Sequence, residues 1–68
     1  MIVTVNGGPR EVEEGTSVAS LVAALGAPRD GRGVAVALGG EVVPRSAWGT
    51  TELAAGVHVE VLTAVQGG

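Results

Sequence analysis

The chain has 68 residues and a formal net charge of −3 at pH 7, and it contains neither cysteine nor lysine. This length fits one domain with a thin core, because so short a chain buries only about 60% of its unfolded surface. The missing cysteines exclude disulfides and Cys/His zinc sites, and the acidic balance argues against nucleic acid as a partner. The apolar runs are far shorter than the roughly 20 residues that span a bilayer. The chain starts on a strand pattern, not a secretory signal, so we expect a cytoplasmic protein with no membrane partner.

The first residues predict a hairpin. MIVTVN alternates in the way typical of a half-buried strand, with Val3 on one face and Ile2 on the other. The following NGG indicates a tight turn, because glycine tolerates positive φ. Residues 9–14, PREVEE, predict the return strand, with Val12 pointing inward.

Residues 15–26, GTSVASLVAALG, predict a helix. Apolar side chains recur with the spacing of one helical face. They are Val18, Leu21, Val22 and Leu25. Ser17 or Thr16 can cap the first turn, Gly26 suits the left-handed position after the last turn, and Pro28 prevents continuation.

The second half of the chain predicts further strands. Residues 34–38, VAVAL, form an alternating strand whose alanines, Ala35 and Ala37, point outward. A Gly-Gly turn leads to a short strand at 41–44, and an irregular or single-turn segment then places Trp48 in or beside the core. Residues 57–65, VHVEVLTAV, predict the last strand.

Together these elements predict the order ββαββ with a short fourth strand. This order is that of an α+β domain of the β-grasp (ubiquitin-like) type, with a mixed sheet of four to five strands and one helix packed on one face. We expect residues 1–64 to form this domain and residues 65–68 to form a flexible Gly-Gly tail.

A classical active site is missing from the sequence. The one histidine, His58, alternates with Glu60 on the outward side of a predicted strand, and no serine stands in a nucleophile-elbow context. The acids at 11, 13 and 14 read as a charged sheet edge, and the glycine-rich pieces GGPR and DGRG lack the P-loop pattern. We therefore expect no enzyme activity, no catalytic residue, no metal and no stably bound cofactor.

Three features together resemble one family. They are Val42-Val43-Pro44-Arg45 followed by Trp48, the short length, and the final Gly67-Gly68. This combination resembles the ThiS family, the sulfur carriers of thiamine thiazole synthesis, over essentially the whole chain. The Gly-Gly end is shared by all ubiquitin-like carriers, whereas the VPR..W piece favours ThiS.

The resemblance implies a role for the chain end. A ThiF-like adenylyltransferase would use ATP to convert the Gly68 carboxylate into an acyl-adenylate. Sulfur from a cysteine-desulfurase-derived persulfide donor would replace AMP, and the resulting thiocarboxylate would supply a ThiG-like thiazole synthase. Gln66 and Gly67 would thread into the partner's active site, where the missing Cβ of glycine allows a narrow channel.

A docking surface is expected next to this tail. Leu62, Ala35 and Ala37 would form a shallow apolar patch on the sheet face away from the helix, and such patches indicate protein interfaces. Arg45 would pair with an acid of the partner or make a local contact near Trp48.

Other functions stay open from the residues alone. The chain would also suit a sulfur carrier for molybdopterin or for tRNA thiolation, or a protein modifier joined to lysines through Gly68. A plain β-grasp interaction module with an idle tail is a further alternative. Deletion of Gly68 would be silent only in that last case.

Overall fold

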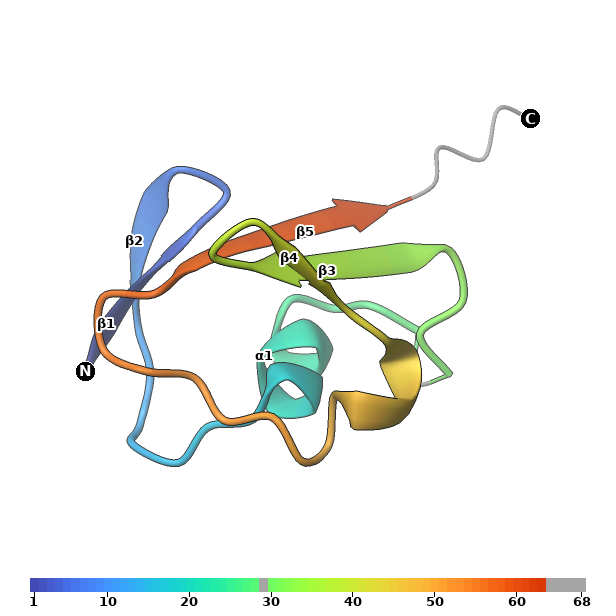
Figure 1. The fold of residues 1–68 in the computed structure, drawn as a ribbon, viewed down its shortest axis with the longest axis horizontal. Coiled ribbons are helices and arrows are strands. Elements are labelled where there is room, and N and C mark those ends of the chain that lie inside the picture. Colours follow the sequence, from blue (N-terminus) through green and yellow to red (C-terminus); the bar gives the residue numbers. More distant parts are fainter. Residues whose placement is uncertain (29, 64–68) are drawn as a thin grey trace.

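The computed structural model describes residues 1–28 and 30–63. Along this part of the chain the elements are β1 (Ile2–Val5), β2 (Gly8–Glu11), α1 (Val18–Ala24), β3 (Val34–Leu38), β4 (Glu41–Val43), the 3₁₀ helix η1 (Arg45–Ala47) and β5 (His58–Thr63) (Figure 1). The strands form one sheet in the order β2-β1-β5-β3-β4. Its β1–β5 pair is parallel and its other pairs are antiparallel, which confirms the mixed sheet expected from the sequence.

The β1–β2 hairpin turns at Asn6 and Gly7, whose φ angles are 49° and 85°. Positive φ at both central residues is typical of a type I′ turn, which matches the twist of the flanking strands. The predicted return strand was wrong at its end, because β2 stops at Glu11. There the chain leaves the sheet edge and turns toward α1, and the carbonyl of Glu13 accepts hydrogen bonds from the N–H and Oγ1 of Thr16 at 3.2 and 2.6 Å.

Helix α1 begins where the sequence predicts. Ser17 has an extended backbone, and its Oγ accepts a hydrogen bond from the N–H of Ser20 at 3.1 Å, so it satisfies one of the free donors of the first turn. Gly26 follows the helix with φ at 85°. The predicted inward position of Leu25 was wrong: the helix ends at Ala24, and Leu25 is 39% exposed at the C-cap.

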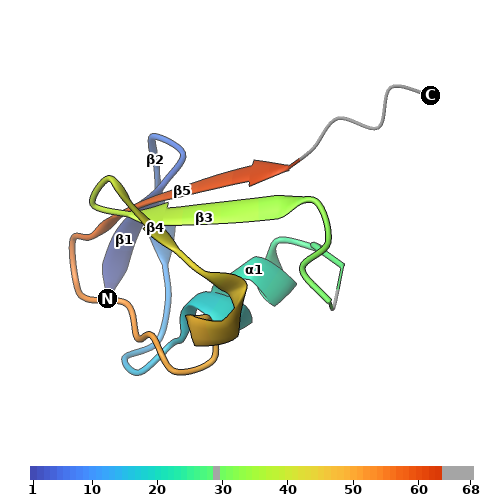
Figure 2. The same cartoon turned by 45° about the vertical axis from the view of Figure 1, so that its right-hand side comes forward.

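The fold has two layers, because α1 and η1 cover the same side of the sheet (Figures 1 and 2). The buried core lies between the sheet and the two helices. It consists of Val3, Val18, Leu21, Val22, Val36, Trp48, Leu53 and Val59. Leu53 lies outside every helix and strand. Backbone hydrogen bonds hold its segment against the start of α1, from the N–H of Leu53 to the carbonyl of Thr16 and from the N–H of Val18 to the carbonyl of Thr51, both at 2.9 Å.

The segment VVPRSAW, residues 42–48, contacts the loop before β3 through two of its side chains. Trp48 is 6% exposed, and its indole N–H donates to the carbonyl of Val43 at 2.9 Å, which confirms its predicted core position. Arg45 donates from Nη1 to the carbonyl of Asp30 at 2.9 Å. Gly31 packs between these two side chains, since a Cβ there would lie 2.6 Å from Cδ of Arg45 and 2.8 Å from Cζ3 of Trp48.

Replacing Gly31 tests this contact. Gly31 has φ at +70°, and the ring beside it is buried, so we expect Gly31→Ala to lower the free energy of unfolding by about 2–4 kcal/mol. Gly26→Ala is the matched control, because Gly26 has φ at +85° but nothing within 4 Å of a Cβ. Its cost should be only the left-handed backbone, about 1–2 kcal/mol. Equal urea midpoints for the two variants would contradict the close packing at Gly31.

Candidate functional site

The candidate site lies where β5 ends. β5 is the middle strand of the sheet, and Thr63 is its last residue. The predicted modification site Gly68 and the predicted tail-threading residues Gln66 and Gly67 lie outside the described residues. The geometry therefore bears on the strand that precedes these residues and on the surface around it.

β5 is held on both sides. On one side it pairs antiparallel with β3, in a register that runs from Val34 opposite Thr63 to Leu38 opposite Val59. On the other side the carbonyls of Val57 and Val59 accept hydrogen bonds at 2.9 Å from the N–H groups of Thr4 and Asn6. Pairing on both edges fixes the direction in which the strand runs.

A shallow hollow of about 370 Å³ lies beside the end of β5. Its lining residues are Gly31, Gly33, Val34, Ala35, Arg45, Leu62 and Thr63. Three of the residues predicted for docking thus meet at one place, although they come from β3, η1 and β5. The sequence reasoning missed Gly31 and Gly33, because it tested DGRG only as a phosphate loop.

The fourth predicted docking residue, Ala37, lies further along the same sheet face. Ala35 is directly opposite Leu62, while Ala37 is opposite both Glu60 on β5 and Val42 on β4. Leu62 is 67% exposed and Val42 is 75% exposed. We call Ala35, Ala37, Val42 and Leu62 the open-face patch. Val36, between the two alanines on β3, is buried in the core, so the patch faces the opposite side of the sheet. Figure 2 shows that α1 covers only one side of the sheet.

Arg45 has a local structural contact. Its guanidinium binds the carbonyl of Asp30, which orients the side chain along the hollow. The carboxylate of Asp30 is engaged by the next arginine, since Oδ1 accepts from the N–H of Arg32 at 2.9 Å and Oδ2 lies 3.6 Å from its Nε. The local alternative predicted for Arg45 is therefore observed, and its pairing with an acid of a partner stays a prediction.

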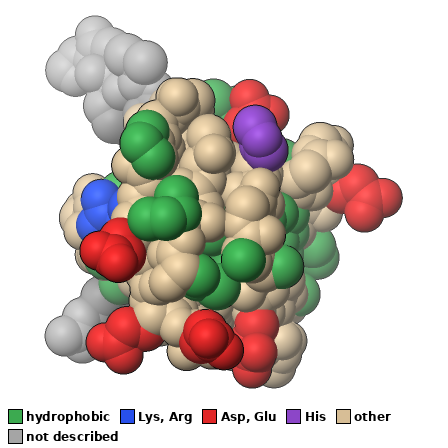
Figure 3. All heavy atoms as spheres, turned by 90° about the vertical axis from the view of Figure 1, so that its left-hand side faces the viewer, with side chains coloured by type: hydrophobic (Ala, Val, Ile, Leu, Met, Phe, Trp, Pro, Cys, Tyr) green, Lys and Arg blue, Asp and Glu red, His purple; other side chains and the backbone are tan. Residues whose placement is uncertain are grey.

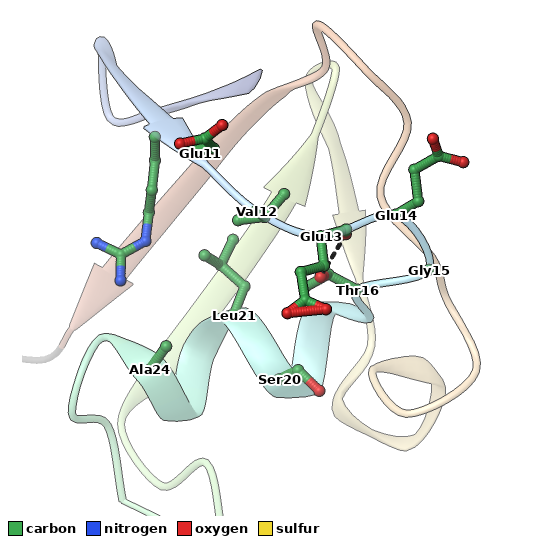
Figure 4. A pocket seen from close by; sticks show the side chains of 10 residues that line it. Glu11, Val12, Glu13, Glu14, Gly15, Thr16, Ser20, Leu21 and Ala24 are labelled. Carbon is green, nitrogen blue, oxygen red and sulfur yellow. Dashed lines mark hydrogen bonds between the residues drawn. The ribbon is translucent and has the colours of Figure 1, made fainter. Parts of the chain in front are cut away.

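The charged side chains are mostly acidic, since the sequence has seven acids against four arginines. Figure 3 shows acidic side chains along the lower border of the face that lies at the left of Figure 1. A second hollow, of about 450 Å³, lies between α1 and the segment that leaves β2 (Figure 4). Its charged lining residues are one arginine, Arg10, and three acids, Glu11, Glu13 and Glu14. A partner with a basic surface would complement this charge.

The described residues contain no cluster of three or more His, Asp or Glu side chains that could hold a metal ion. His58 and Glu60 are both exposed on β5, as the sequence predicted. Within residues 1–28 and 30–63, α1 is far too short to cross a membrane.

Comparison with known proteins identifies the family. The ThiS family model matches residues 3–68. A crystal structure of the thiamine biosynthesis protein ThiS from Geobacter metallireducens is 38% identical in sequence, with both chains covered in full and a TM-score of 0.81. An NMR structure of a thiamine biosynthesis protein from the same organism is also 38% identical, with this chain covered in full, 88% of the other chain covered and a TM-score of 0.82. No curated protein sequence matches the chain. The match over nearly the whole length, on the same fold, shows that the chain belongs to the ThiS family.

Proposed function

We propose that this chain is a sulfur carrier for the thiazole part of thiamine and that Gly68 is the residue that carries the sulfur. The observation that carries the proposal is the ThiS family match, which extends through Gly67 and Gly68. The position of these residues in the chain agrees with it, because they follow the best-paired strand of the sheet after a few residues.

The proposed chemistry starts from a poor electrophile. A carboxylate resists attack by sulfur until one oxygen becomes part of a good leaving group. The Gly68 carboxylate attacks the α-phosphate of ATP, so that pyrophosphate leaves and an acyl-adenylate forms. A persulfide sulfur then attacks the acyl carbon and AMP leaves. Cleavage of the S–S bond by a second thiol releases the thiocarboxylate and leaves a disulfide on the donor.

The catalytic apparatus belongs to partners in this proposal. Binding a triphosphate needs cationic groups and a metal ion, whereas this chain has a net charge of −3. We therefore assign ATP binding to a ThiF-like adenylyltransferase and use of the thiocarboxylate to a ThiG-like thiazole synthase. The sequence contains neither lysine nor cysteine, so an activated Gly68 finds no side-chain amine or thiol on a second copy of this sequence.

The open-face patch suits the docking of these partners. It combines exposed aliphatic side chains with two small alanines, so a partner can approach the sheet closely. Leu62 lies one residue before the end of β5, and Arg45 lines the adjoining hollow. A partner that covers this surface also covers Thr63, the last residue of β5, after which the Gly-Gly end follows in the sequence.

The proposal predicts the outcome of an ATP–pyrophosphate exchange assay. With a purified ThiF-like adenylyltransferase, the full chain should support exchange of labelled pyrophosphate into ATP. Deletion of Gly68 should abolish exchange, because the carboxylate then lies one residue short of the α-phosphate. The control is Ala55→Gly, in an exposed turn before β5. Exchange that persists without Gly68 would contradict this assignment.

A second prediction concerns the open-face patch. Leu62→Asp should weaken binding to the adenylyltransferase about tenfold or more, because it places a charge in an apolar interface. Ala55→Asp adds the same charge at the opposite end of β5 and should leave the affinity within about twofold, since surface changes outside the contact have small effects. Titration calorimetry measures both affinities. Equal affinities for the two variants would show that docking uses another surface.

A further inference from the structure

The side chain of Asn6 extends the sheet where the backbone of β1 turns away. Its Oδ1 accepts a hydrogen bond from the N–H of Val61 at 2.8 Å, and its Nδ2 donates to the carbonyl of Val61 at 3.1 Å. The two residues are 55 positions apart in the sequence. One amide group thus satisfies both backbone groups of one residue on β5, as a neighbouring strand would.

These bonds continue a regular series. The carbonyls of Val57 and Val59 accept hydrogen bonds from the backbone N–H groups of Thr4 and Asn6, so the bonds recur every two residues along both segments. The next pair along β5 falls at Val61, but the hairpin turn has by then carried the backbone of β1 away. The Asn6 side chain supplies the missing pair two residues before the end of β5.

The turn alone does not require asparagine. A type I′ turn needs a residue that tolerates positive φ, and glycine and aspartate meet that need as well. Glycine has no side chain to reach Val61. Aspartate offers an acceptor to the N–H of Val61 but repels its carbonyl. Asparagine serves both the turn and the two-way contact with β5.

We propose that Asn6 is a positioning residue that clamps the end of β5 and so sets the direction in which the chain enters the active site of the adenylyltransferase. This inference rests on the proposed function. Asn6 does not touch the reacting carboxylate, and it acts through Val61. The sheet surface docks the partner, and the clamp raises the fraction of docked complexes in which the carboxylate reaches ATP.

The clamp is tested first by amide hydrogen exchange followed by NMR. Asn6→Gly keeps the turn and removes the side chain, so the exchange rate at Val61 should rise about tenfold. Asn6→Asp keeps the acceptor and should raise it less. The amide of Val36, a buried residue of β3, is the reference. Its exchange rate should change only as far as the global stability changes. An unchanged rate at Val61 in Asn6→Gly would overturn the clamp.

The second measurement separates positioning from stability. In single-turnover adenylation, Asn6→Gly should lower the rate at saturating partner about threefold to tenfold while the dissociation constant stays the same, because the docking surface is intact. Thr51→Val is the matched control: it removes one hydrogen bond, from Oγ1 of Thr51 to the carbonyl of Ala47 at 2.7 Å, which joins two residues outside the sheet. Its thermal midpoint should fall comparably and its rate should not change.

The hydrogen-exchange and adenylation measurements separate the positioning role of Asn6 from the proposed carrier function. Faster exchange at Val61 with an unchanged adenylation rate would overturn the positioning role and leave the carrier function intact. Equal rate losses in Asn6→Gly and Thr51→Val would assign the effect to stability and also overturn it. Absence of adenylation in the unaltered chain would overturn the proposed function itself, and with it the role of Asn6 in the reaction.

Discussion

β5 lies between β1 and β3, and its pairing on both edges joins the two halves of the sheet. A domain of this size has a thin core, so a strand that must keep its direction up to its last residue needs neighbours along its length. β3 supplies them on one side from Val59 to Thr63. On the other side β1 is too short, and the amide of Asn6 takes over at Val61. Residues at the start of the chain thus pair with β5 almost to its last residue.

The second constraint is the contact between the VVPRSAW segment and the loop before β3. Trp48 closes one end of the core, while Arg45 and Gly31 hold the loop against it. This contact also forms one wall of the hollow beside Leu62. The VVPRSAW motif, which resembles the ThiS family, therefore has a structural role. It shapes the surface next to the end of β5. A role for Arg45 toward a partner would act through a side chain that is already oriented.

Local patterns predicted most of the elements, because alternation and helical spacing are properties of neighbouring residues. β3 was predicted with its observed bounds, since Gly33 and Gly39 flank a clean alternation.

The features that escaped prediction depend on distant residues. Leu53 enters the core from a segment without periodicity, and Leu25 is exposed because the helix ends one residue earlier than its apolar spacing suggests. The contacts of Gly31 and of Asn6 join parts of the chain that no local pattern connects. For the site, strand alternation singled out Leu62 and Ala35, and the VVPRSAW segment singled out Arg45, but only the tertiary fold brings them to one hollow.

Intact mass spectrometry of the chain, isolated from its cells under non-reducing conditions, tests the carrier function directly. We expect a fraction in which one oxygen is replaced by sulfur, and fragmentation should place that sulfur on Gly68. A chain that carries only an ordinary carboxylate, even after incubation with ATP, a sulfur source and cell extract, would contradict the carrier function. Gly68 found in an isopeptide bond to lysines of other proteins would instead indicate a protein modifier.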